Sequence, residues 1–148
     1  MGAYERALRL LTVRARGRQD LTRDLERRGF RPDAIRDALD ELERKGWLNE
    51  LAAARSVVRV KGERYGRARL LRELASRGFS GTTIDAALLE HTAEEEEKNL
   101  VRAFARLWKS SAHIERQRRR GRVLRALLRR GFSPDRISAI MKGANEVD

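Results

Sequence analysis

The stretch "RRGFSPDRI", residues 129–137, combines a glycine, a phenylalanine and a Ser-Pro-Asp run. The chain carries two similar stretches, "RRGFRPDAI" at 27–35 and "SRGFSGTTI" at 76–84. A glycine commonly ends a helix in the left-handed conformation, and the residue after it often packs against the preceding turn. A serine can then cap the next helix, and a proline suits its first turn. We therefore interpret each stretch as a joint between two helices, rather than as a binding motif used three times.

Apolar residues stand at the same distances from the three joint glycines. A leucine lies four residues before each glycine, a leucine or valine eight before, and an isoleucine six after. In chain order these residues are Leu21, Leu25 and Ile35, then Leu70, Leu74 and Ile84, then Val123, Leu127 and Ile137. The pattern indicates an internal repeat with a period of about 50 residues. Within it, Phe30, Phe79 and Phe132 should pack on Leu25, Leu74 and Leu127, while Ser80 and Ser133 cap the following helices and Pro32 and Pro134 begin theirs.

Helical spacing of apolar residues continues through the rest of the chain. It is clear for Tyr4, Ala7, Leu8 and Leu11, for Ile35, Ala38, Leu39 and Leu42, and for Leu100, Val101, Phe104, Leu107 and Trp108. The β-branched run "RSVVRV" at 55–60 follows a helix-favouring alanine run. We predict an all-α fold of nine helices, in three tandem three-helix repeats at 1–48, 49–91 and 92–148. Because each repeat of such an array contacts mainly its neighbours, we expect it to be elongated and curved.

The composition indicates the class of partner. Of 148 residues, 34 are Lys or Arg and 22 are Asp or Glu, which gives a net charge of +12. That imbalance favours a polyanion such as nucleic acid, or an acidic protein surface. The absence of cysteine excludes disulfides and thiolate chemistry. No apolar stretch approaches the roughly 20 residues that span a bilayer, and "MGAYERALRLL" lacks a signal-peptide core, so we expect a cytoplasmic protein.

Two helices joined by a short glycine turn also resemble a DNA-binding helix-turn-helix, whose second helix enters the major groove. In the first repeat that helix reads "PDAIRDALDELERKG" and in the second it carries Asp85 and Glu90. Acidic helices do not approach phosphates. Only "PDRISAIMKG" in the third repeat could do so, and we therefore set groove recognition aside.

The basic residues gather on the helices before the joint glycines. The stretch "ERQRRRGRVLRALLRR", residues 115–130, has eight arginines and one glutamate. Arg118, Arg122, Arg125 and Arg129 share one helical face, opposite Val123, Leu124, Leu127 and Leu128. We call these four arginines the arginine stripe. A shorter version in the second repeat, "YGRARLLRELASR", has Arg67, Arg69, Arg72 and Arg77 around Leu70, Leu71 and Leu74. Either set could bind a partner or simply be a solvated face.

Other candidate sites have ordinary structural explanations. Thr92 with Glu95 forms a capping box, and acidic residues in a first turn suit the helix dipole. Adjacent glutamates point in different directions round a helix and cannot all ligate one ion. His91 and His113 have no metal-binding partner pattern, and Trp47 and Trp108 are most simply core residues, with base stacking as the alternative. No phosphate-binding loop, dinucleotide motif or nucleophile elbow occurs, so we expect no enzyme, no cofactor and no metal.

The ordered fragments of the three repeats resemble the RecX family of bacterial regulators of the RecA recombinase. The fragments are "L..L..RGF.P..I...L..L...GWL", "YG..R...EL..RGF....I..AL" and "R....LLRRGFSPD.I", which together cover nearly the whole chain. One stretch departs from the family pattern: in "NELAAA", Asn49 and Glu50 approximate the usual acidic pair, and Ala53 stands where an aromatic residue is usual.

The resemblance implies a function and a partner. Family members insert in the helical groove of the RecA filament on single-stranded DNA and restrain its activities. This resemblance predicts a non-catalytic, negative modulator of RecA, acting as a monomer with no membrane partner and with weak or indirect contact to single-stranded DNA. The alternative from the residues alone is a helical-repeat protein that binds DNA or RNA directly through its arginine-rich third repeat. The expected interface residues are Tyr65, Arg67, Arg69, Arg72 and the arginine stripe.

Overall fold

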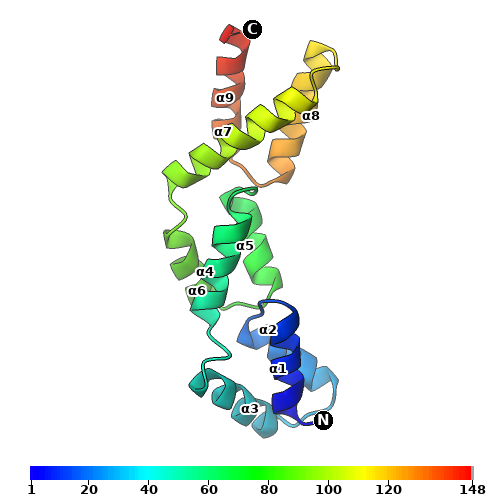
Figure 1. Cartoon of the computed structure of the whole chain (residues 1–148), viewed down its shortest axis with the longest axis vertical. Coiled ribbons are helices and arrows are strands. Elements are labelled where there is room, and N and C mark those ends of the chain that lie inside the picture. The colour runs from blue at the N-terminus through cyan, green and yellow to red at the C-terminus, as the bar shows by residue number, and fades with distance from the viewer. Residues whose placement is uncertain (148) are drawn as a thin grey trace. The chain divides into compact units, whose positions relative to one another are not determined.

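The computed structural model describes residues 1–147, with side chains described as far as Gly143, and within them the chain is all-α. Nine helices occupy these residues: α1 Ala3–Val13, α2 Arg18–Arg27, α3 Pro32–Arg44, α4 Glu50–Lys61, α5 Arg67–Ser76, α6 Gly81–Leu89, α7 Ala93–Ser110, α8 Arg116–Arg129 and α9 Pro134–Val147. The predicted fold class and number of helices are confirmed, and the run at 55–60 lies inside α4. Figure 1 shows the helices coloured along the chain.

The repeated stretches form the predicted helix joints. Gly29, Gly78 and Gly131 have φ angles of 86°, 76° and 85°, the left-handed region that only glycine enters without strain. The N–H of the phenylalanine after each glycine donates to the carbonyl of the predicted leucine, at 3.2 Å for Phe30, 3.4 Å for Phe79 and 3.3 Å for Phe132. This bond is the one that closes a Schellman motif. The joints are therefore built by helix-end chemistry.

The starts of the following helices also match the sequence. Pro32 and Pro134 are the first residues of α3 and α9. The Ser80 hydroxyl accepts a hydrogen bond from the Thr83 N–H at 3.3 Å, as predicted for a cap. The Ser133 carbonyl accepts the first helical bond of α9, and a cap by the Ser133 hydroxyl stays a prediction. Thr92 caps α7 by accepting from the Glu95 N–H at 3.2 Å.

Close contacts divide the chain into two compact units. Unit 1 contains Met1–Val57 and Glu73–Leu89, and unit 2 contains Val58–Arg72 and the chain from Glu90 onward. The division passes through α4 and α5, so the two units do not coincide with the three sequence repeats. The repeat boundaries given above stay a prediction.

The core of unit 1 is formed chiefly by α1, α2 and α3. Figure 1 shows these three helices, blue to cyan, gathered around one another. Their buried side chains are Ala3, Ala7, Leu10, Leu21, Leu25, Ile35, Ala38, Leu39 and Leu42, joined by Leu48. Phe30 packs at the edge of this core and is only partly buried. The positions predicted from helical spacing are the buried ones in α3, whereas in α1 only Ala7 of the predicted set is buried. Tyr4, Leu8 and Leu11 are partly buried there, and Ala3 and Leu10 face the core instead.

The core of unit 2 lies where α7 crosses α8 and α9, as Figure 1 shows. Its buried side chains are Leu100, Ala103, Val123, Leu127, Phe132, Ile137 and Met141. Phe104, Leu107 and Trp108 pack against them from α7 and are partly buried.

Some apolar residues are more exposed than predicted. Trp47 was expected in the core, yet 61% of it is exposed. It follows Gly46, whose φ of 82° ends α3, and the next residue, Leu48, takes the core position with 4% exposed. In α8 only Val123 and Leu127 are buried, so the adjacent Leu124 and Leu128 are 37% and 40% exposed. Leu71 and Val101 likewise lie beside, rather than within, the buried stripe of their helices.

Candidate functional site

In unit 2 a close contact of Gly66, separate from the helix joints, holds the start of α5 against the end of α8. We call this contact the glycine brace. The Gly66 N–H donates to the Arg130 carbonyl at 2.7 Å, and the Arg67 N–H donates to the Glu96 carboxylate at 3.4 Å. A Cβ atom on Gly66 would lie 2.4 Å from the Gly131 carbonyl oxygen. Only glycine allows this approach, because real Cβ contacts are never so short.

Unit 1 repeats the glycine brace at the equivalent positions. The Gly17 N–H donates to the Arg77 carbonyl at 2.8 Å, and the Arg18 N–H donates to the Glu50 carboxylate at 2.5 Å. Neither brace was predicted from the sequence. The brace also explains the positions of Glu50 and Glu96, because each glutamate accepts a hydrogen bond from an N–H at the start of a helix. For α2, Glu50 does so where the helix has no side-chain cap of its own.

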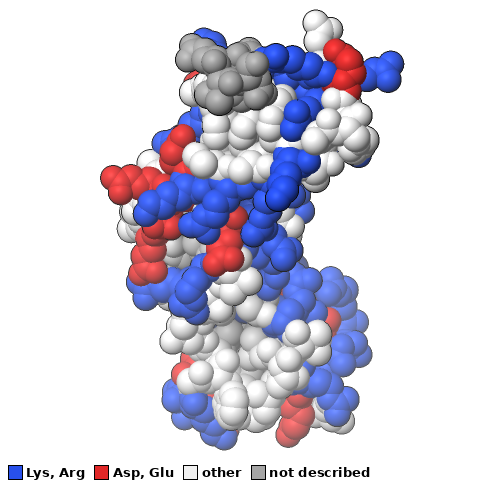
Figure 2. Space-filling view, turned by 45° about the horizontal axis from the view of Figure 1, so that its top comes forward, with Lys and Arg blue, Asp and Glu red and all other residues white. Residues whose placement is uncertain are grey.

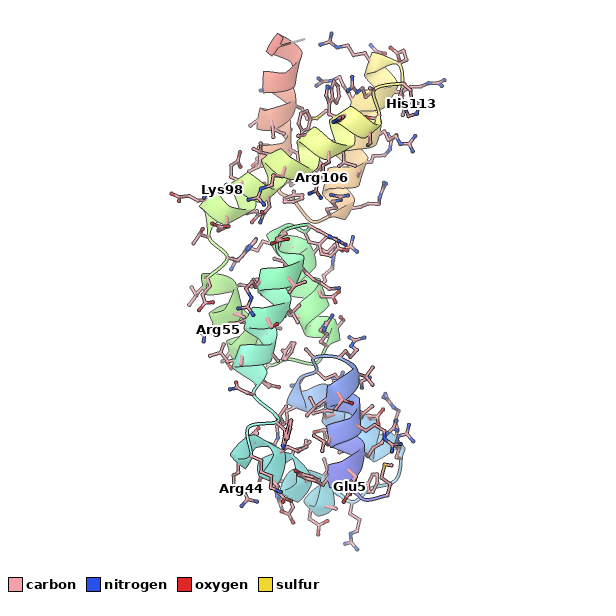
Figure 3. All side chains as sticks on the ribbon, in the orientation of Figure 1. Glu5, Arg44, Arg55, Lys98, Arg106 and His113 are labelled. Carbon is pink, nitrogen blue, oxygen red and sulfur yellow. The ribbon has the colours of Figure 1, made fainter. Side chains whose placement is uncertain are left out.

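The brace in unit 2 creates a cleft of about 500 Å³ between the start of α5, the end of α7 and α8. Among the residues that the structure describes, five arginines and no acidic residue line it. The arginines are Arg64, Arg69, Arg122, Arg129 and Arg130. Tyr65 and His113 also line the cleft, and Figure 3 labels His113 in the loop between α7 and α8. We call this hollow the arginine cleft.

Arg69 is held in place within the arginine cleft. Its guanidinium carbon lies 3.9 Å from the centre of the Tyr65 ring, and its Nη1 donates to the Arg129 carbonyl at 3.1 Å. The Lys61 ammonium approaches the same ring at 5.9 Å. Cation–π contact and a carbonyl acceptor together restrict the rotamers of Arg69. One face of the Tyr65 ring is correspondingly covered.

The predicted interface residues separate into two groups. Tyr65, Arg69, Arg122 and Arg129 meet at the arginine cleft, whereas Arg67, Arg72, Arg118 and Arg125 do not line it. All four members of the arginine stripe are exposed, as expected, but only alternate members reach the cleft. Sequence reasoning missed Arg64, Arg130 and His113, because the brace that assembles them joins residues about one repeat apart.

The arginines of the cleft differ from those of the first repeat in their pairing. Arg27 and Arg28 pair with Asp24 at 3.7 and 3.1 Å. Although partial burial opposes it, these cations lower the pKa of Asp24. No described side chain forms an ion pair with Arg64, Arg122 or Arg129. Figure 2 shows the resulting surplus of blue lysine and arginine over red acidic side chains on the displayed face.

The aromatic residues of the third repeat are not free to stack on bases. The Arg119 guanidinium lies 3.7 Å from the centre of a Trp108 ring, and the Phe104 ring stacks on Trp108 at 5.6 Å between centroids. Arg119 also donates to the Trp108 carbonyl. Trp108 therefore packs within its own unit.

His91 and Glu96 are the two buried titratable side chains described in unit 2. His91 is 7% exposed, its Nε2 has no hydrogen-bond partner among the described residues, and it borders a second hollow that Arg67 and Glu96 also line. Burial lowers the pKa of His91, against the opposing effect of Glu96 and, more weakly, Glu95, while Arg67 adds to the lowering. His91 is thus held neutral near pH 7.

The lowered pKa predicts a loss of stability in mild acid. The unfolded chain takes up the His91 proton near its ordinary pKa of about 6.5, and the folded chain takes it up only at lower pH. The contribution of His91 to the free energy of unfolding should therefore be fully present above about pH 6.5. It should fall as the pH drops from there through the folded-state pKa. Urea denaturation at a series of pH values measures this, and His91→Gln should flatten the curve in that range. An equal slope in the variant would show that His91 is not responsible.

Among the described residues, no cluster of three or more His, Asp or Glu side chains could hold a metal ion. The same part of the chain has no helix of the length and apolarity that crossing a bilayer requires.

Comparison with known proteins places the chain in one family. Models for the RecX first, second and third three-helix domains match residues 3–42, 49–88 and 94–141. The regulatory protein RecX of Pseudomonas fluorescens is 36% identical, with 96% of this chain and 91% of the relative covered. That of Herminiimonas arsenicoxydans is 35% identical, with 95% and 91% covered.

A solved structure gives the same fold. The crystal structure of RecX from Lactobacillus salivarius matches with a TM-score of 0.77 at 22% identity, over 97% of this chain and 94% of that one. The likeness in structure agrees with tandem three-helix domains, and the sequence matches run through all three. The chain therefore belongs to the RecX family of regulatory proteins.

Proposed function

We propose that this protein is a non-catalytic, negative modulator of the RecA recombinase, and that it binds the helical groove of the RecA filament on single-stranded DNA. Its membership in a family of regulatory proteins is the observation that carries the proposal. The proposed partner is a polymer that carries phosphates and protein carboxylates together.

The charge distribution supports such a partner. The chain has a net charge of +12, and the arginine stripe lies exposed on α8. Surface cations of this kind attract a polyanion over several ångströms and raise the rate of association. In the proposal, the arginine stripe and the group Tyr65, Arg67, Arg69 and Arg72 contact the filament.

The proposal predicts that neutralising the arginine stripe weakens regulation. In a variant with Arg118, Arg122, Arg125 and Arg129 changed to Gln, the melting temperature should barely change, because all four side chains are exposed. Binding to a RecA-coated strand and inhibition of the RecA ATPase should both fall. Fluorescence anisotropy with bare and RecA-coated labelled strands, together with an ATPase assay, measures these effects.

A matched control removes the same charge from unit 1. Arg9, Arg14, Arg23 and Arg36 are exposed and form no ion pair with a described side chain, and their replacement by Gln should leave ATPase inhibition largely intact. Equal losses in both variants would mean that net charge alone matters, and unchanged inhibition in both would exclude the arginine stripe from the interface.

A second candidate function is direct binding of DNA or RNA without a recombinase, which the unpaired arginines of the cleft favour. In that case the stripe variant should lose bare-strand and filament binding together. The slope of log affinity against log salt should then shrink by about 0.7 for each lost phosphate contact on a single strand. Loss of filament binding with bare-strand affinity retained would favour the recombinase as the partner.

A further inference from the structure

We propose that the arginine cleft of unit 2 is a discrete site for phosphate groups, and that it holds successive phosphates of a nucleotide chain. The inference goes beyond the proposed function, because the cleft would bind phosphate whether or not a recombinase covers the strand. It also differs from a general basic surface, since it assigns binding to the cleft and not to the arginine stripe as a whole.

The charges of the cleft favour an anion. Arg64, Arg69, Arg122, Arg129 and Arg130 surround one hollow without any acidic neighbour in its lining. An anion that enters the hollow would offset their mutual repulsion, and guanidinium groups match the oxygens of phosphate through paired N–H donors. A volume of about 500 Å³ exceeds what one phosphate fills, which favours a chain of phosphates.

Hydrogen bonds also occupy backbone carbonyls at the end of α8 that would otherwise repel an anion in the cleft. The cleft adjoins the C-terminus of α8, where free carbonyls carry partial negative charge. Here the Arg129 carbonyl accepts from Arg69 at 3.1 Å, and the Arg130 carbonyl accepts from the Gly66 N–H at 2.7 Å. Both carbonyls are thereby occupied, and a cation stands in front of the first of them.

Recognition in the cleft should be independent of base sequence. Arg69 covers one face of the Tyr65 ring, with its guanidinium carbon 3.9 Å from the ring centre, and this contact competes with base stacking there. Apart from His113, the other polar side chains of the lining are arginines and serines. These side chains suit phosphate contacts, which position a nucleic acid without reading its sequence. The ligand class is therefore the sugar–phosphate backbone of a single strand or a free polyphosphate.

The test compares three pairs of arginines in unit 2, each changed to Gln in the whole protein without recombinase. Arg122 and Arg129 line the cleft; Arg118 and Arg125 have the same spacing on α8 but do not line it. Arg102 and Arg106 are exposed on α7, where Figure 3 labels Arg106, and serve as the matched control. The probe is a labelled oligothymidylate, measured by anisotropy over a range of salt concentrations.

We expect the Arg122/Arg129 variant to lose about tenfold in affinity per residue, as charge-assisted hydrogen bonds are lost. Its salt slope should shrink by about 1.4, from two phosphate contacts on a single strand. The other two pairs should change affinity by less than about threefold, the scale of weak surface electrostatics. Equal losses from all three pairs, or no loss from the cleft pair, would overturn the inference.

Competition distinguishes the sources of phosphate and excludes a nonspecific anion surface. Inorganic triphosphate should displace the oligothymidylate from the wild type and bind the Arg122/Arg129 variant more weakly, whichever source the cleft serves. Stronger displacement by an oligothymidylate than by triphosphate, at equal phosphate concentration, would assign the cleft to a strand, and the reverse order would assign it to a free polyphosphate. Displacement by polyglutamate as effective as by either phosphate ligand would count against a phosphate site. Because no recombinase is present, a failure of RecA regulation leaves these outcomes unaffected.

Discussion

Replacing Gly66 with alanine should lower the free energy of unfolding by about 3 kcal/mol or more, at the upper end of overpacking effects. The added Cβ would lie 2.4 Å from the Gly131 carbonyl oxygen and 2.6 Å from the Cα of Phe132. Both neighbours are backbone atoms, so no flexible side chain can move aside. The hydrogen bond from Gly66 to Arg130, now 2.7 Å, would have to lengthen or break.

Chemical denaturation followed by circular dichroism measures this loss. Gly17→Ala should lower the free energy of unfolding by a similar amount, because its Cβ would lie 2.1 Å from the Gly78 carbonyl oxygen in unit 1. Gly81 at the start of α6 has no atom within 4 Å of an added Cβ, and alanine there should leave stability unchanged or slightly higher. Gly66→Ala and Gly81→Ala variants of equal stability would show that the glycine brace contributes little.

The fold could be predicted because its signals are local. Helical spacing placed residues such as Leu21, Leu70 and Leu127 on buried faces, and all three are fully buried. The left-handed glycine followed by phenylalanine depends on residues within one turn, so the sequence itself contains both partners of each hydrogen bond. Element type and the ends of the helices follow from such signals.

The candidate site could be predicted only in part, because its assembly is nonlocal. Gly66 meets Arg130, and Arg67 meets Glu96, across distances in the sequence far longer than the few residues that helical spacing relates. The acidic run at 94–97 was correctly attributed to helix structure, but its buried member, Glu96, also caps another helix. For the same reason the sequence indicated a stripe on one helix, whereas the structure gathers only part of it into a cleft.

For Trp47 the local sequence signal gave a wrong prediction, because the residue is exposed and not in the core. A tryptophan after an amphipathic helix is apolar enough for a core, but the turn at Gly46 directs the chain so that Leu48 is buried instead. Only one of two adjacent residues after a helix end can face inward. Hydrophobicity alone did not decide between them.

Truncating Phe132 to alanine should destabilise the protein by about 3–5 kcal/mol, the usual cost of removing a buried phenylalanine ring. Phe132 is 3% exposed and packs with Leu127, Ile137 and Met141 in the core of unit 2. It also borders the hollow beside His91, so part of the space left by the ring would open toward water. That opening should not rescue stability, because the lost contacts are those with the core.

The three joint phenylalanines provide an internal scale for this prediction. Phe79 is 3% exposed like Phe132, so its truncation should cost a similar amount, whereas Phe30 is only partly buried and should cost less. Trp47→Ala, at a residue that is 61% exposed, should change stability least although it removes the largest side chain. Denaturation midpoints of the four variants should therefore rank by burial and not by the size of the ring. If Phe132→Ala were as stable as Trp47→Ala, the phenylalanine of the third joint would contribute nothing to the core, and its place in the repeat would need an explanation in binding.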